Sequence, residues 1–138
     1  MLFWIIAIAL VALLAYVRFA PVEAAQWHSA APGDTLGETR GANSLIWRAP
    51  YEEGLLQSLE EVIRKTPRTE VVAGSIADGQ ITYVTRSALM GYPDFTTIGT
   101  YGDDPRYVEI YARSRFGKSD LGVNAKRVEG WLAEIKTR

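Results

Sequence analysis

The first seventeen residues, Met1 to Val17, form an apolar run that contains no charged side chain. An α-helix rises 1.5 Å per residue, so the run is about 25 Å long as a helix, close to the roughly 30 Å hydrocarbon core of a bilayer. Trp4 and Tyr16 lie near its two ends, where aromatic rings favour the membrane interface, and Pro21 is expected to end the helix. We therefore predict a single transmembrane anchor over residues 1–20.

A cleaved signal peptide is the main alternative for this segment. Val22-Glu23-Ala24 has small residues at alternate positions, as a signal peptidase requires, but no basic side chain precedes the apolar run. A buried helix of a soluble fold is the third alternative.

The side of the membrane is predicted from the residues that flank the span. Arg18, the only basic side chain close to the apolar run, favours a cytoplasmic C-terminal side under the positive-inside rule. A short N-terminal anchor followed by a folded domain is, however, the usual way to display that domain across the membrane, and one arginine does not prevent translocation. We expect the domain to be periplasmic or otherwise extracytoplasmic.

The composition argues against several classes of function. The formal net charge is −1, so no basic excess points to nucleic acid as a partner. The chain has no cysteine, which removes thiolate catalysis, disulfides and cysteine-based zinc sites. Asp103 and Asp104 lie between Gly102 and Pro105 and are interpreted as turn residues, and the single histidine, His28, falls in an expected linker. No cofactor or metal site is predicted.

The rest of the chain divides into a linker and one domain. Residues 21–49 are rich in Ala, Gly, Pro, Ser and Thr with little periodicity, which is typical of a linker. A helix is expected from Pro50 to Pro67, with one apolar face formed by Leu55, Leu56, Leu59, Val62 and Ile63. The domain is therefore expected to occupy residues 50–138.

Four β-prone runs follow the expected helix: TEVVAGSI, GQITYVTRSA, FTTIGTY and RYVEIYAR. The first two meet at Ala77-Asp78-Gly79, in which Asp-Gly is a strong hairpin signal, and the turn-like residues 102–105 lie between the last two. A final helix begins near Asn124, the expected N-cap, and has Val128, Trp131, Leu132 and Ile135 on one face. The predicted fold is α+β, with a transmembrane helix and a linker before a helix, a four-stranded antiparallel sheet and a second helix.

The stretch RSRFGKSDLGVN, residues 113–124, holds the densest group of polar side chains. It is not a phosphate-binding P-loop, because that motif needs a glycine at the position of Ala112 and a helix directly after Ser119. Its glycines and Asn124 are instead typical of a turn that leads into a helix. Candidate ligand or partner contacts in and just after this stretch are Arg115, Lys118, Ser119, Asp120, Asn124 and Arg127.

Two roles are open for these polar groups. Asp120 can pair with Arg115 or Arg127 in an internal network that orders the loop, or the basic groups can bind an anion such as a lipid headgroup.

The stretch SRFGKSDLGVNAKRVE, residues 114–129, resembles the signature S-R-x-G-x-S-D-L-G-x-N-x-x-R-x-E of the proteins catalogued as domain of unknown function 1499. The matching positions are Ser114, Arg115, Gly117, Ser119, Asp120, Leu121, Gly122, Asn124, Arg127 and Glu129. The resemblance implies no established reaction, and it makes a membrane anchor unsurprising because attached and exported members occur. Family members often have a cysteine-containing segment before the first helix, so no metal or redox role is carried over to this cysteine-free chain.

Two functional hypotheses follow from these observations. The preferred one is a non-enzymatic binding module of the cell envelope that contacts an envelope protein or a lipid headgroup through residues 113–124. The alternative is a hydrolase that uses Ser114 or Ser119 with Asp120, with Lys118 as a desolvated base.

Overall fold

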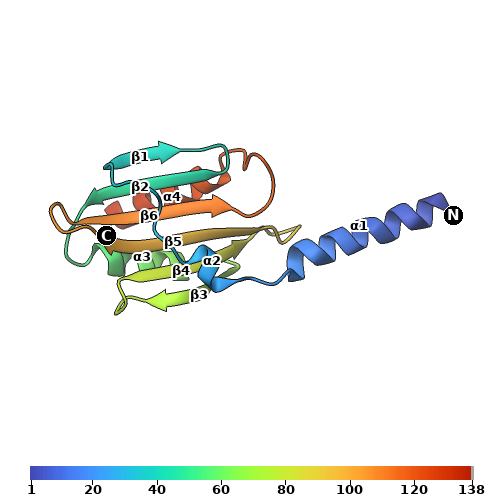
Figure 1. Ribbon diagram of the computed structural model, residues 1–138, viewed down its shortest axis with the longest axis horizontal. Helices are drawn as coiled ribbons and strands as arrows, with labels where there is room; N and C mark the ends of the chain where they lie inside the picture. Colours follow the sequence, from blue (N-terminus) through green and yellow to red (C-terminus); the bar gives the residue numbers. More distant parts are fainter. Residues whose placement is uncertain (138) are drawn as a thin grey trace.

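The computed structural model describes residues 1–137. The helix α1 (Leu2–Phe19) projects from one end of a domain in which two helices pack behind a sheet (Figure 1). The elements that follow α1 are α2 (Ala24–Trp27), β1 (Gly37–Arg40), β2 (Ser44–Pro50), α3 (Leu55–Arg64), β3 (Thr69–Ser75), β4 (Gln80–Arg86), β5 (Pro93–Tyr101), β6 (Tyr107–Ser114) and α4 (Val123–Lys136).

The sheet has six strands in the order β1-β2-β6-β5-β4-β3, and every neighbouring pair is antiparallel. The α+β class is confirmed, but the predicted count of four strands is wrong. The two further strands, β1 and β2, lie in the segment that was expected to be a linker, except for Pro50 at the end of β2, and β2 pairs along its whole length with β6. All four residues of β1 are exposed, so this strand lacks the apolar alternation that identifies a half-buried strand.

The apolar core lies between one face of the sheet and the helices α3 and α4. It includes Leu45 from β2, Leu59 and Ile63 from α3, Ile98 from β5 and Val128 from α4, all of them fully buried. The apolar faces predicted for the two helices are therefore the faces that contact the sheet. The first of them begins at Leu55, later than expected, because Pro50 ends β2.

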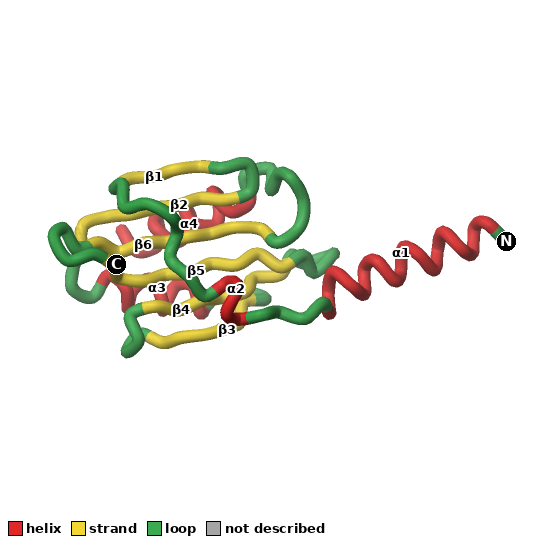
Figure 2. Tube along the Cα trace, viewed as in Figure 1, coloured by secondary structure: helices red, strands yellow, loops and turns green. Residues whose placement is uncertain are grey.

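The opposite face of the sheet is crossed by residues 20–36, which we call the N-terminal strap (Figure 2). Trp27 in α2 stacks on Phe95 of β5, with the ring centroids 4.1 Å apart. Arg113 of β6 donates hydrogen bonds to the Trp27 carbonyl oxygen and, over 2.9 Å, to the Thr97 hydroxyl. These contacts cover the strand residues that point away from α3 and α4.

A buried ion pair lies under the same strap. The Arg48 Nε is 2.8 Å from a carboxylate oxygen of Glu109, and both side chains are almost inaccessible to solvent. The second oxygen of Glu109 accepts a hydrogen bond from the Ala31 backbone N–H, and Arg48 also donates to the Pro32 carbonyl over 2.9 Å. The strap thus supplies the additional partners that a desolvated ion pair requires.

The helix α1 is long and apolar enough to cross a membrane, and almost all of its surface is exposed. An N-terminal signal sequence has the same properties. The last turns of α1 nevertheless contact the domain: Val17 is buried, and the Tyr16 ring meets the Phe116 ring edge-on at 6.1 Å.

Candidate functional site

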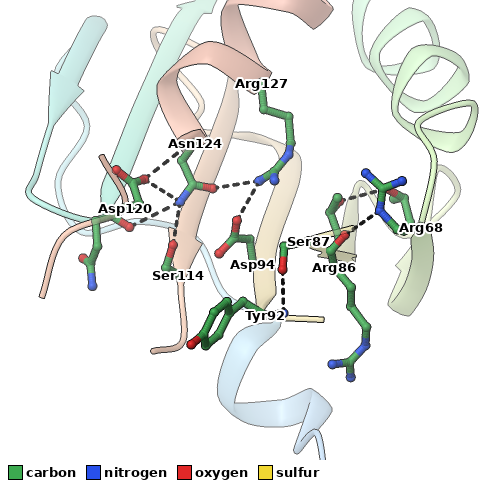
Figure 3. Close-up of polar contacts among 12 residues, drawn as sticks. Arg68, Arg86, Ser87, Tyr92, Asp94, Ser114, Asp120, Asn124 and Arg127 are labelled. Carbon is green, nitrogen blue, oxygen red and sulfur yellow. Dashed lines mark hydrogen bonds and ion pairs between the residues drawn. The ribbon is translucent and has the colours of Figure 1, made fainter. Parts of the chain in front are cut away.

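The residues of the signature stretch surround Asn124, which is fully buried in the first turn of α4 (Figure 3). Its side-chain N–H groups donate to an Asp120 carboxylate oxygen over 2.8 Å and to the Ser114 hydroxyl over 3.0 Å. Its carbonyl oxygen accepts a hydrogen bond from Arg127 over 3.2 Å. A single amide side chain therefore connects β6, the loop after it and α4.

The predicted N-cap role of Asn124 is wrong, because α4 begins one residue earlier, at Val123. Asp120 satisfies the free N–H groups at this helix start: one carboxylate oxygen accepts from the Gly122 N–H over 2.8 Å and the other from the Asn124 N–H over 3.2 Å. Gly122 has φ of +79°, a conformation that favours glycine and lets the chain turn beneath the carboxylate.

The internal network reaches Asp120 through Asn124 and ends in an ion pair with β5. Arg127 is 3.1 Å from a carboxylate oxygen of Asp94, and both side chains are largely buried. Arg115 is not part of the network, because its guanidinium donates to the Pro21 carbonyl oxygen over 2.9 Å. The expected ion pair between Arg115 and Asp120 is therefore replaced by the chain Asp120–Asn124–Arg127–Asp94.

The protonation of Asp120 is controlled by these contacts. Partial burial alone would raise the pKa of its carboxyl, but hydrogen bonds from the Asn124 side chain and from the backbone N–H groups of Gly122 and Asn124 favour the anion. The balance lowers the pKa of Asp120 below its ordinary value, so the carboxylate is ionised at neutral pH.

A cavity of about 510 Å³ lies between α1, the β4–β5 loop and the loop that joins β6 to α4. Leu13 and Val17 of α1 form one wall, and Phe116 and Val123 continue this apolar surface. The polar part of the lining consists of Ser87, Asp94, Ser114, Ser119 and Asp120. The lining is therefore mostly apolar with a smaller polar part, and this amphipathic lining includes two acidic residues of the polar network.

The other predicted contact residues lie at different places around this cavity. Ser119 lines it and accepts a hydrogen bond from the Leu121 backbone N–H over 3.2 Å. Lys118 is exposed on the loop, and Asn124 and Arg127 stand behind the lining residues Ser114 and Asp94. Asp94 and the two α1 residues were not predicted as part of the site. Asp94 stands 33 positions before its partner Arg127, and Leu13 and Val17 were interpreted only as part of the apolar span.

The two serines proposed for a hydrolase have amide partners. The Ser114 hydroxyl accepts from the Asn124 side chain, and the Ser119 hydroxyl accepts from a backbone N–H. His28 lies on the other face of the sheet, where its Nδ1 is 2.8 Å from the Thr82 hydroxyl. Within residues 1–137, no group of three or more histidine, aspartate or glutamate side chains is placed to hold a metal ion.

A family model described as Protein of unknown function (DUF1499) matches residues 23–135 of the chain. The chain belongs to this family. The DUF1499 match begins after α1 and extends through the strap, the sheet, α3 and nearly all of α4, so the cavity combines the family domain with the apolar helix that precedes it. The resemblance found in residues 114–129 is thereby confirmed. A comparison with curated proteins finds no match.

Proposed function

We propose that this protein is a single-pass, membrane-anchored binding module of the cell envelope, without enzymatic activity, whose ligand is a membrane lipid or a similar amphipathic molecule. The observation that supports this proposal is the amphipathic cavity beside the signature loop. One of its walls is contributed by α1, the helix that is long and apolar enough to span a bilayer. A ligand in this position has its apolar part against Leu13, Val17 and Phe116.

The polar lining indicates the kind of headgroup that fits. Asp94, Asp120, Ser114 and Ser119 offer carboxylate and hydroxyl oxygens, which accept hydrogen bonds from a hydroxyl or ammonium group. Arg115 and Lys118, which neighbour lining residues in the sequence, are proposed to contact the phosphate of the same headgroup. Ser119 and Asp120 are therefore proposed as direct contacts, and Asn124 and Arg127 as the residues that position the lining.

Native mass spectrometry of the full chain extracted in mild detergent tests this proposal. We expect lipid adducts on the parent protein and on Val71→Trp, a control that adds the same ring to the exposed strand β3. Val123→Trp fills the cavity and should lose the adducts. A parent protein without adducts, or equal adducts on both variants, would refute a lipid site in the cavity.

The membrane placement is tested separately. We propose that α1 remains uncleaved and that the domain lies on the periplasmic side. The intact chain should then resist alkaline carbonate extraction, and protease added to spheroplasts should digest the domain. A mature N-terminus at Ala25 or Gln26 would show a cleaved signal peptide, and protection from protease would place the domain in the cytoplasm.

A further inference from the structure

Two loops lie at the end of the domain from which α1 projects, and we call them the membrane-facing edge: residues 87–92, between β4 and β5, and residues 115–122, between β6 and α4 (Figure 1). Each loop carries a leucine that contributes almost nothing to the core. The side chains of Leu89 and Leu121 are 87% and 91% exposed, higher values than for any other large apolar residue in the described part of the chain after α1. Tyr92, also on this edge, is 42% exposed.

The position of α1 indicates how deep this edge lies. The helix has 18 residues and is therefore about 27 Å long, so spanning a hydrocarbon core of roughly 30 Å requires all of it. Leu13 is six residues, or about 9 Å along the axis, before the end of the helix at Phe19. Because Leu13 lines the same cavity as Leu121, and Tyr16 contacts Phe116, the second loop lies beside the last two turns of α1 and meets the bilayer surface when α1 spans the bilayer.

Arginines with no acidic partner among residues 1–137 surround the same edge. Arg86 donates to the Gly91 carbonyl oxygen over 3.0 Å, and Arg115 donates to the Pro21 carbonyl. Arg18 packs against Gly91, where a Cβ would lie 3.1 Å from one of its guanidinium nitrogens. Exposed Lys118 adds a fourth cationic group. The whole chain has a net charge of −1, but these four cationic groups gather at the edge that would meet the phosphates of a bilayer.

From the depth, the exposed leucines and the arginines together, we infer that the membrane-facing edge docks on an anionic bilayer surface. Leu89 and Leu121 insert among the headgroups, and Arg18, Arg86 and Arg115 contact lipid phosphates. The docked edge brings the mouth of the cavity to the bilayer, so a lipid enters sideways from the membrane instead of crossing water. This inference rests on the membrane span of the proposed function but not on the identity of the ligand.

The absence of native cysteine allows single-site fluorescent labelling of the full chain. We would place a polarity-sensitive dye on Leu89→Cys and Leu121→Cys, with Ala77→Cys as the exposed control at the β3–β4 turn, the other end of the sheet (Figure 1). The proteins are reconstituted in vesicles of phosphatidylcholine mixed with phosphatidylglycerol. We expect blue-shifted emission and strong quenching by headgroup-level nitroxide lipids at positions 89 and 121, and neither effect at position 77.

Charge is tested in the same vesicles. Arg86→Gln combined with Arg115→Gln should reduce the quenching at position 121, whereas Arg106→Gln, an exposed arginine at the far end of the sheet, should not. High salt should act like the double variant, because the Debye length falls from about 10 Å at 0.1 M to about 3 Å at 1 M.

A label on Leu10→Cys separates the two proposals. If the dye at position 10 is quenched within the hydrocarbon core while the dyes at positions 89 and 121 give water-like emission, the docking is overturned but the anchor stays intact. Water-like emission at position 10 as well would overturn the anchor itself, and the docking with it. Quenching at positions 89 and 121 that the arginine variants leave unchanged would refute the role assigned to the phosphate contacts.

Discussion

Replacing Asn124 by alanine should destabilise the domain more than any other single change in the signature stretch. The side chain is fully buried and has three side-chain partners: Asp120, Ser114 and Arg127. A hydrogen bond to a charged group contributes about 1.5–3 kcal/mol and one to a neutral group about 0.5–1.5 kcal/mol. Water at the cavity can replace part of what Asp120 and Ser114 lose, so we expect a loss of about 2–4 kcal/mol in the free energy of unfolding.

Thermal melting of the full chain in detergent measures this loss. For a domain of this size, a change of 1 kcal/mol moves Tm by about 3–4 °C, so Asn124→Ala should melt roughly 6–16 °C below the parent. Ser119→Ala removes one solvent-exposed hydrogen bond from the same loop and should move Tm by no more than about 2 °C. A parent-like melt for Asn124→Ala, repeated with Asp120→Ala and Arg127→Ala, would show that the network does not hold the loop.

Three further predictions concern ion pairs, pH and backbone. Glu109→Gln should lower the free energy of unfolding by about 3–5 kcal/mol, because it leaves Arg48 buried without its anion. Glu129→Gln breaks an exposed ion pair and should lower it by less than about 1 kcal/mol. Urea titration of the two variants and the parent measures both free-energy changes. The pKa of the Asp120 carboxyl is lower in the folded than in the unfolded protein, so the stabilisation that its anion provides is fully present above the unfolded pKa and is lost as the pH falls through the folded pKa. The stability difference between the parent and Asp120→Asn, measured by urea titration at a series of pH values, should therefore shrink on acidification. A difference that stays constant with pH would contradict this assignment. Gly74→Ala should lower the melting temperature by the equivalent of about 1–3 kcal/mol, since Gly74 has φ of +82° and a Cβ there would lie 2.0 Å from the Gln80 carbonyl oxygen.

The parts of the fold that depend on local patterns could be predicted from the sequence. The apolar faces of α3 and α4 recur at helical spacing, and Asp78-Gly79 marks the turn between β3 and β4 without reference to the rest of the chain. The extents of β3 to β6 follow from the same kind of signal.

The remaining elements depend on distant partners. The polar strand β1 joins the sheet only through β2, and β2 carries Arg48, whose partner Glu109 lies 61 residues later in the sequence. The strap has no periodicity because single residues such as Trp27 hold it, not a repeating face. At the candidate site, the loop was predictable from its density of polar groups. Asp94, the ion-pair partner of Arg127, and the wall that α1 contributes were not predictable from local sequence.

The join between α1 and the domain limits where this protein can act. Only four residues, Ala20 to Glu23, separate the end of α1 from the start of α2. A fully extended chain covers about 3.3–3.6 Å per residue, so the five steps from Phe19 to Ala24 would keep α2 within about 18 Å of the end of α1 even if the domain detached from the helix. If α1 anchors the protein in the membrane, a domain tethered this closely cannot reach across a periplasm or hand a molecule to an opposing membrane. If α1 is the anchor, its encounters take place by lateral diffusion within one bilayer, and any partner protein must come to that same surface.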